Sequence, residues 1–295
     1  MKKATSRATS DSVDPLRVKS DSAAKETPAP DVHVYNNHVR CVTDSRGFET
    51  HRNRSPLEIR VDASDGFIPL WAENVTLRYR FQERSIRRYF DDPDAAKTEI
   101  LKLFGEALDA WGDAVPVRFK LDYNASDFEL VMMQQADCDN SGCVLASTFF
   151  PDAGRHHFRM YPTLFEQSRK EQVETFVHEI GHIFGLRHFF ANVSETDWPS
   201  RLFGEDNAFS IMNYGTKSVL TDADKSDLKK LYRAAWNGEL TKIDGAPIRL
   251  MRPFSSLADA PRPHSLTAIS LESLGQTSEV APIQISIGGR RVTIE

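Results

Sequence analysis

Three histidines in one short stretch of the chain have the spacing of a metal site. The stretch is HEIGHIFGLRH, and His178 and His182 are four residues apart in it. On a helix this spacing places both imidazoles on one face, with about 5–6 Å between their Cβ atoms. Glu179 is rotated away from that pair and can take a proton from a water on the metal. Gly185 can end the helix in a left-handed turn that returns His188 to the same ion. Three neutral imidazoles leave a fourth position for water, as in catalytic zinc sites.

The alternative for this stretch is an amphipathic helix that carries surface histidines. A bare HExxH pattern would fit that alternative, because two histidines and a glutamate are common on exposed helices. The added Gly185 and His188 fall where a third ligand requires them. The sequence therefore predicts one catalytic Zn²⁺ ion.

Composition excludes several classes of partner. The chain has 295 residues and a net charge of −5, with no long basic stripe, so we expect no nucleic-acid partner. No apolar run approaches the length of a membrane span, so we expect no membrane partner. The first residues are positively charged, but the apolar stretch of a secretory signal does not follow them. Three cysteines do not make a disulfide scaffold. The sequence therefore does not determine the cellular compartment of the protein.

The pattern along the chain predicts one globular region between two less regular ones. Residues 1–30 are polar and are expected to be disordered, and residues 31–66 have short apolar alternations typical of extended segments. Strands are predicted over 74–81, 117–121, 128–133, 143–150 and 158–161, with a helix from Asp92 to Gly112. The motif helix is predicted to start near Ser168, and a last helix at Thr221 follows a long loop over 189–209. These elements indicate an α+β domain over 67–238, and residues 239–295 form a tail of unknown role.

The two zinc-site motifs resemble those of the metzincin zinc endopeptidases. HEIGHIFGLRH is followed by SIMNYG over 210–215, which is similar to the Met-turn of that family, with Met212 as the residue beneath the zinc. IPLWAENVTLRYRF, VLASTFFP and LTDADKSDLKKLY are similar to matrixin elements in the same order, over roughly 66–235. The resemblance implies a twisted, mainly parallel five-stranded sheet with three helices, and a zinc cleft on the side of the edge strand. It also makes residues 31–66 similar to a pro-segment.

The resemblance also assigns the substrate-binding elements. It implies that a peptide substrate lies along the edge strand, at Cys143, Val144, Leu145 and Ala146, where main-chain hydrogen bonds would hold it. Asn213 and Tyr214 would wall the pocket beside the zinc. Tyr214 is similar to the Met-turn tyrosine of the astacins, which steadies the oxyanion. The alternative is a packed tyrosine whose hydroxyl binds the backbone.

One departure from the matrixin pattern concerns a second metal. Matrixins usually hold a second, structural zinc, but Ser147 stands where one of its histidine ligands would be. The upstream HxD pair is also missing. We therefore expect no second zinc and interpret His156 and His157 as surface residues.

The cysteines allow several interpretations. Cys41, in HVRCVTDSRG, resembles the matrixin cysteine switch, in which a thiolate of the pro-segment takes the fourth zinc position. The glycine expected after that cysteine is absent, and an ordinary thiol is the alternative. Cys138 and Cys143 could form a small disulfide loop. Calcium is a weaker alternative there, because Asp137, Asp139 and Asn140 supply too few oxygen ligands.

The sequence thus predicts a zinc endopeptidase that acts on proteins or peptides, with Glu179 as the general base. One alternative is a catalytically silent, zinc-containing protein that binds peptides. Another is a protease that mainly processes its own N-terminal segment. An extracellular location agrees with the resemblance, and the oligomeric state and the substrate stay open.

Overall fold

The computed structural model describes residues 15–16, 39–41, 43, 59–62, 66–139, 142–188, 200–203, 211–212, 219–256, 283–287 and 290–294. The chain divides into two compact units, Met1–Ala258 and Asp259–Glu295, and each is described by itself. Within the described ranges, no helix is long and apolar enough to cross a membrane.

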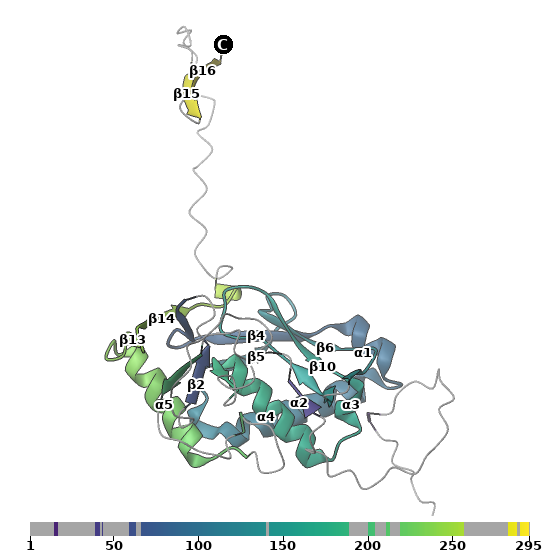
Figure 1. The fold of residues 1–295 in the computed structure, drawn as a ribbon. Helices are drawn as coiled ribbons and strands as arrows, with labels where there is room; N and C mark the ends of the chain where they lie inside the picture. Colours follow the sequence, from purple (N-terminus) through teal and green to yellow (C-terminus); the bar gives the residue numbers. More distant parts are fainter. Residues whose placement is uncertain are drawn as a thin grey trace, which may run out of the picture. The chain divides into compact units, whose positions relative to one another are not determined.

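A five-stranded sheet forms the centre of the first unit (Figure 1). Its order is β5 (Arg118–Leu121), β4 (Thr76–Phe81), β6 (Phe128–Met132), β10 (His156–Met160) and β9 (Ala146–Ser147). Neighbours are parallel except β9, which runs antiparallel to β10. Inward side chains of β4 are buried in alternation, as period-two patterning requires. The predicted mainly parallel five-stranded sheet is confirmed.

Helices complete the core, and their predicted starts are confirmed. The long helix α2 (Pro93–Trp111) is capped by the Asp92 side chain and packs against α4 (Arg169–Ile183). Capping boxes at Ser168 and Thr221 begin α4 and α5 (Asp222–Trp236). Three short helices are additional: α1 (Glu83–Tyr89), α3 (Pro162–Phe165) and the 3₁₀ turn η2 (Gly112–Ala114). The pattern that would predict α1 is weak, because only Ser85 and Ile86 in this helix are buried.

The predicted strand over 143–150 is divided between two sheets. Its first part lies in β8 (Gly142–Val144), between β7 (Asp137–Asp139) and the N-terminal strand β1 (Val39–Arg40). Its second part is β9, the edge of the central sheet. Cys138 and Cys143, directly opposite each other in β7 and β8, form a disulfide. Of the alternatives for these two cysteines, the structure therefore contains the disulfide.

Segments outside the predicted domain add further strands to it. β2 (Ile59–Asp62) lies between β11 (Leu186–Arg187) and β12 (Ser200–Phe203). β13 (Lys242–Ile243) pairs with β14 (Ala246–Met251), and β14 runs parallel to β3 (Ile68–Trp71). Side chains of Ile243 and Ala246 are buried in the core. The packed unit thus continues beyond residue 238. In the second unit, β15 (Ile283–Ile287) and β16 (Arg290–Ile294) form an antiparallel hairpin.

Candidate metal centre

Helix α4 and the turn after it position the three histidines of the motif. His178 and His182 lie on consecutive turns of α4, and the helix ends at Ile183. Gly185 follows with a φ of +87°, a left-handed conformation that a side chain would strain. An added Cβ would also stand 3.2 Å from the carbonyl oxygen of Pro69. The turn then leads through β11 to His188, which is fully buried.

The three imidazoles converge on one point. Their Nε2 atoms are separated by 3.1 Å between His178 and His182, 3.0 Å between His178 and His188, and 3.2 Å between His182 and His188. Two of the rings are oriented from behind by main-chain carbonyls. His178 Nδ1 lies 2.8 Å from the oxygen of Ile211, and His182 Nδ1 lies 2.7 Å from the oxygen of Leu186. Each Nδ1 therefore donates, and each Nε2 presents a lone pair to the centre.

This donor set fits a zinc ion. Imidazole nitrogens bind zinc at about 2.0–2.1 Å, so tetrahedral ligands stand about 3.3 Å apart. The observed separations of 3.0 to 3.2 Å are close to this value. Lone pairs turned toward one another at such distances repel, and a cation among them removes the repulsion.

An apolar floor supports the cluster from below. Met212 is buried, and its sulfur would stand 2.5 Å from a Cβ placed on Gly181, between the two helical histidines. The indole of Trp111 lies on the same glycine and donates from Nε1 to the carbonyl of Val177 at 3.0 Å. The motif helix therefore contacts Met212 and Trp111 at a glycine, where an added Cβ would force the Met212 side chain to shift.

Two residues of the N-terminal segment reach the cluster. Sγ of Cys41 lies 3.5 Å from His182 Nε2 and 3.3 Å from Oε1 of Glu179. It groups with the three histidine nitrogens within 4.8 Å. Thr43 donates from its hydroxyl to Oε2 of Glu179 at 3.0 Å. Sequence reasoning missed Thr43, because no spacing or motif relates it to a glutamate 136 residues away.

The remaining predicted residues belong to the expected substrate strand or fall outside the described residues. Cys143 and Val144 pair in parallel with Val39 and Arg40, so the N-terminal segment occupies this part of the expected substrate strand. The carbonyl of Leu145 accepts from the N–H of Tyr161 at 2.9 Å, and Ala146 belongs to β9. Asn140, Asn213, Tyr214 and most of the loop over 189–209 are outside the described residues.

The two histidines interpreted as surface residues differ in burial. His157 is exposed, and its partial desolvation together with nearby Arg159 lowers its pKa. His156 is mostly covered because its ring stacks on Phe149, with 4.3 Å between the ring centroids. His156 is therefore better described as a packed side chain than as a surface one.

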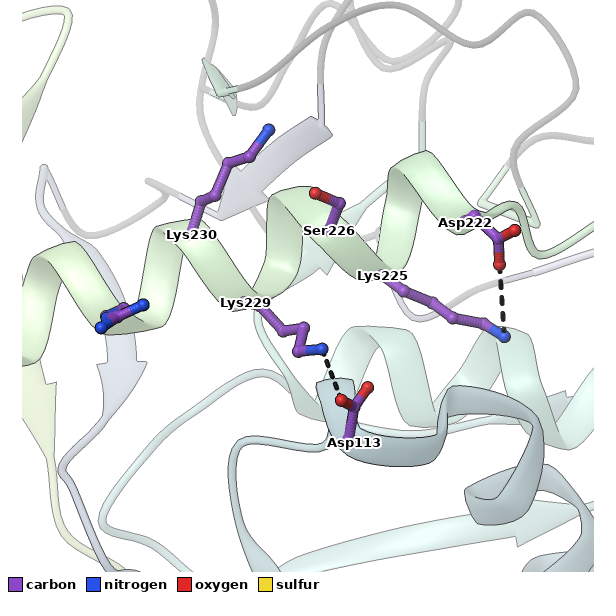
Figure 2. Close-up of a pocket in the computed structure, with 7 residues that line it drawn as sticks. Asp113, Asp222, Lys225, Ser226, Lys229 and Lys230 are labelled. Atoms are coloured by element: carbon purple, nitrogen blue, oxygen red, sulfur yellow. Dashed lines mark hydrogen bonds and ion pairs between the residues drawn. The ribbon is translucent and has the colours of Figure 1, made fainter.

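A separate pocket lies along the outer side of α5. It has a volume of about 340 Å³ and is lined by charged side chains, four of them cationic: Lys225, Lys229, Lys230 and Arg233. Figure 2 shows Lys229 directed at Asp113 across the pocket, where they form a 2.6 Å ion pair. None of the histidines of the motif lines this pocket. It is therefore a different feature from the metal centre.

Comparison with known proteins finds a family whose model covers the histidine motif. A family model described as Matrixin matches residues 70–195. Metalloendoproteinase 4-MMP of Arabidopsis thaliana is 29% identical over 136 residues, which are 41% of this chain and 38% of that protein. Macrophage metalloelastase of Rattus norvegicus is 28% identical over 149 residues, or 46% of this chain and 32% of that protein. The chain thus spans about a third of the length of these relatives. The resemblance to the matrixin branch of the metzincins is confirmed.

Solved structures were also found to be similar, and that of myroilysin is one of them. The structure of myroilysin aligns with 59% of this chain and 98% of its own, at 14% identity and a TM-score of 0.37.

Proposed function

We propose that this matrixin-like domain is a zinc-dependent endopeptidase that hydrolyses peptide bonds in proteins. The observation that carries the proposal is the convergence of three Nε2 atoms within 3.2 Å of one another, with the carboxylate of Glu179 beside them. His178, His182 and His188 would hold the ion, and Met212 would support it from below. The match to the matrixin family supports the same assignment.

The chain's own groups would divide the work of hydrolysis. A zinc ion at the three histidines would supply a Lewis acid, which lowers the pKa of water and polarises the scissile carbonyl. Glu179 would act as a base and not as a ligand, because the ligand atoms that group at the centre come from the three histidines and Cys41 and not from this carboxylate. It would accept a proton from the attacking water and deliver it to the leaving amine.

The N-terminal segment would keep this centre latent. The Cys41 thiol lies where a fourth ligand would stand, and thiolates bind zinc readily. β1 meanwhile pairs with β8, so main-chain groups that could hold a substrate are already occupied. The proposed enzyme therefore needs removal or displacement of residues 39–43 before it acts.

A matched pair of variants tests the proposal. Protein loaded with zinc and treated with a thiol-modifying mercurial is given a casein substrate, with and without a chelator. Wild-type cleavage is expected to be lost with the chelator, and Glu179→Gln is expected to lower the rate by at least about a hundredfold while zinc stays bound. Glu174→Gln, the same change on the same helix, should cleave normally.

Equal cleavage by the Glu179→Gln variant and the wild type would exclude the proposed role. Absence of cleavage in every sample, including a Thr43→Val variant treated in the same way, would support the silent peptide-binding alternative. Mass spectrometry of the untreated protein addresses self-processing, since a new terminus between residues 40 and 67 that the Glu179→Gln variant lacks would show it.

A further inference from the structure

We propose that Thr43, like Cys41, is a plug of the metal centre, meaning a side chain that blocks the centre and holds the N-terminal segment there. Thr43 does so through the general base and not through the metal. Its hydroxyl engages the carboxylate of Glu179 and the main-chain N–H of Thr148 at once. The inference rests on the proposed function, because it assigns a regulatory contact to the same site.

The contacts of Thr43 use the one donor of its hydroxyl and one of its two acceptor lone pairs. Oγ1 donates to Oε2 of Glu179 at 3.0 Å and accepts from the N–H of Thr148 at 2.9 Å. The side chain is 5% exposed, so water does not compete for either bond. A hydroxyl bound to a carboxylate makes a charge-assisted hydrogen bond, which is roughly twice as strong as a neutral one.

Both oxygens of the proposed base are thereby occupied by the same short segment. Cys41 Sγ contacts Oε1 of Glu179, and Thr43 contacts Oε2. A water must reach this carboxylate to give it a proton, and side chains of the segment stand against both of its oxygens. Thr43 thus blocks the base directly, whether or not a thiolate reaches the metal.

Thr43 also occupies a main-chain group next to the edge strand. Thr148 directly follows β9 and is buried, and its N–H is directed at the Thr43 hydroxyl. When the segment leaves, this N–H and the Glu179 carboxylate become available together. The Thr43 side chain therefore covers both the base and a main-chain N–H beside the expected substrate strand.

The two plugs, Cys41 and Thr43, belong to one short segment, called the hook below, but they differ in chemistry. Thr43 N–H donates to Cys41 Sγ at 3.4 Å, and β1 sets the position of both residues by pairing with β8. A thiol responds to oxidants, mercurials and metal loss, whereas a hydroxyl on a carboxylate responds to none of these. Modification of the thiol alone should therefore leave part of the hold in place.

The rate at which Cys41 reacts with dithiodipyridine measures opening of the hook. The chain has three cysteines, and Cys138 and Cys143 are joined in a disulfide, so the reagent titrates the Cys41 thiol. The measurement uses the full, zinc-loaded chain and needs no turnover. Thr43→Val keeps the shape but removes the hydroxyl, and Thr43→Ser keeps the hydroxyl.

Thr43→Val is expected to raise the reaction rate by about tenfold or more, equivalent to about 1.4 kcal/mol of opening free energy. Thr43→Ser should react within about threefold of the wild type. In a Glu179→Ala background, Thr43→Val should raise the rate by less than it does in the wild-type background, because only the bond from the N–H of Thr148 is then left to lose. Circular dichroism of each variant verifies that the fold is kept.

Two results would overturn the inference. One is a Thr43→Val rate equal to that of the wild type. The other is an unchanged Thr43→Val effect in the Glu179→Ala background, which would mean that the hydroxyl does not act through the base. Since thiol exposure is measured without substrate, a failure of the proposed protease activity would not alter either reading.

Discussion

The N-terminal strand β1 and the C-terminal strand β14 both run parallel to a strand of the domain, but different forces hold them. β1 pairs with β8 over two residues, and the contacts beyond it are polar ones of Cys41 and Thr43 with Glu179. β14 pairs with β3 over four residues, from Ile248↔Ile68 to Met251↔Trp71, and apolar side chains next to it are buried.

The difference indicates which attachment is permanent. Hydrophobic burial stabilises by about 25 cal/mol per Å² and does not depend on metal or redox state. Polar contacts exchange for water on opening, so each adds only about 0.5–1.5 kcal/mol net, or about 1.5–3 kcal/mol where a charge takes part. The N-terminal attachment is therefore suited to release, and the C-terminal attachment is suited to stability.

The largest expected effect is on the free energy of unfolding. It comes from a set of hydrogen bonds just after β14, called the clamp below, which ends the C-terminal attachment. Buried Asp127 accepts from the N–H and hydroxyl of Ser255, at 2.6 and 2.9 Å, and from the N–H of Arg78 at 2.7 Å. Asp127→Ala leaves three donors without their acceptor and should lower the free energy of unfolding by about 3 kcal/mol in urea titration. Ser255→Ala, which removes one bond, should cost about 1 kcal/mol.

The Asp127→Ala variant also tests whether the N-terminal and C-terminal attachments open independently. Asp127→Ala should leave the thiol reaction rate of Cys41 within about twofold of the wild type, because the clamp does not contact the hook. A large rise in that rate would show that the two attachments open together and that the comparison is wrong.

An intermediate effect is expected at the floor of the metal centre. Gly181→Ala puts a Cβ against the sulfur of Met212 and should destabilise the domain by about 2 kcal/mol in thermal unfolding, because the close-packed floor must shift. Gly105→Ala is the matched control, since it lies inside α2 with nothing within 4 Å of the added Cβ. It should stabilise the protein by about 0.5–1 kcal/mol. Equal effects of the two changes would contradict the packing that the structure describes.

The smallest expected effect on stability concerns Tyr232, which links β3 to the end of α4. Its hydroxyl accepts from Trp71 N–H of β3 at 3.3 Å and donates to the carbonyl of Phe184, just after α4, at 3.0 Å. Tyr232→Phe should cost about 1 kcal/mol at pH 7 in urea unfolding.

The same variant has a defined dependence on pH. Burial raises the pKa of Tyr232 above its usual value of 10.0, so the folded state favours the neutral form. Its contribution is complete below pH 10 and is lost as the pH rises further, since the unfolded chain ionises first. The gap between wild type and Tyr232→Phe should therefore narrow above pH 10. A constant gap would show that the hydroxyl is not buried as described.

Elements with strong local signals could be predicted from the sequence. Asp92, Ser168 and Thr221 each begin a helix, because capping depends on side chains within three residues of the helix start. The strand over 74–81 was evident from alternation. The split between β8 and β9 was not, because which sheet a residue joins depends on partners far along the chain.

The sequence by itself determined the cluster of imidazoles and its neighbouring carboxylate. His178, Glu179, His182 and His188 lie within eleven residues, and helix geometry with one left-handed glycine fixes their relation. The family resemblance named Met212 and Cys41 as neighbours of the zinc, but only the tertiary structure decided their contacts: Met212 against Gly181, the thiol of Cys41 beside His182, and the hydroxyl of Thr43 on the base. Those contacts join residues up to 141 positions apart, and many methionines, thiols or hydroxyls could have satisfied the same local pattern. Packing of the whole domain selects among them, and no short-range signal records that choice.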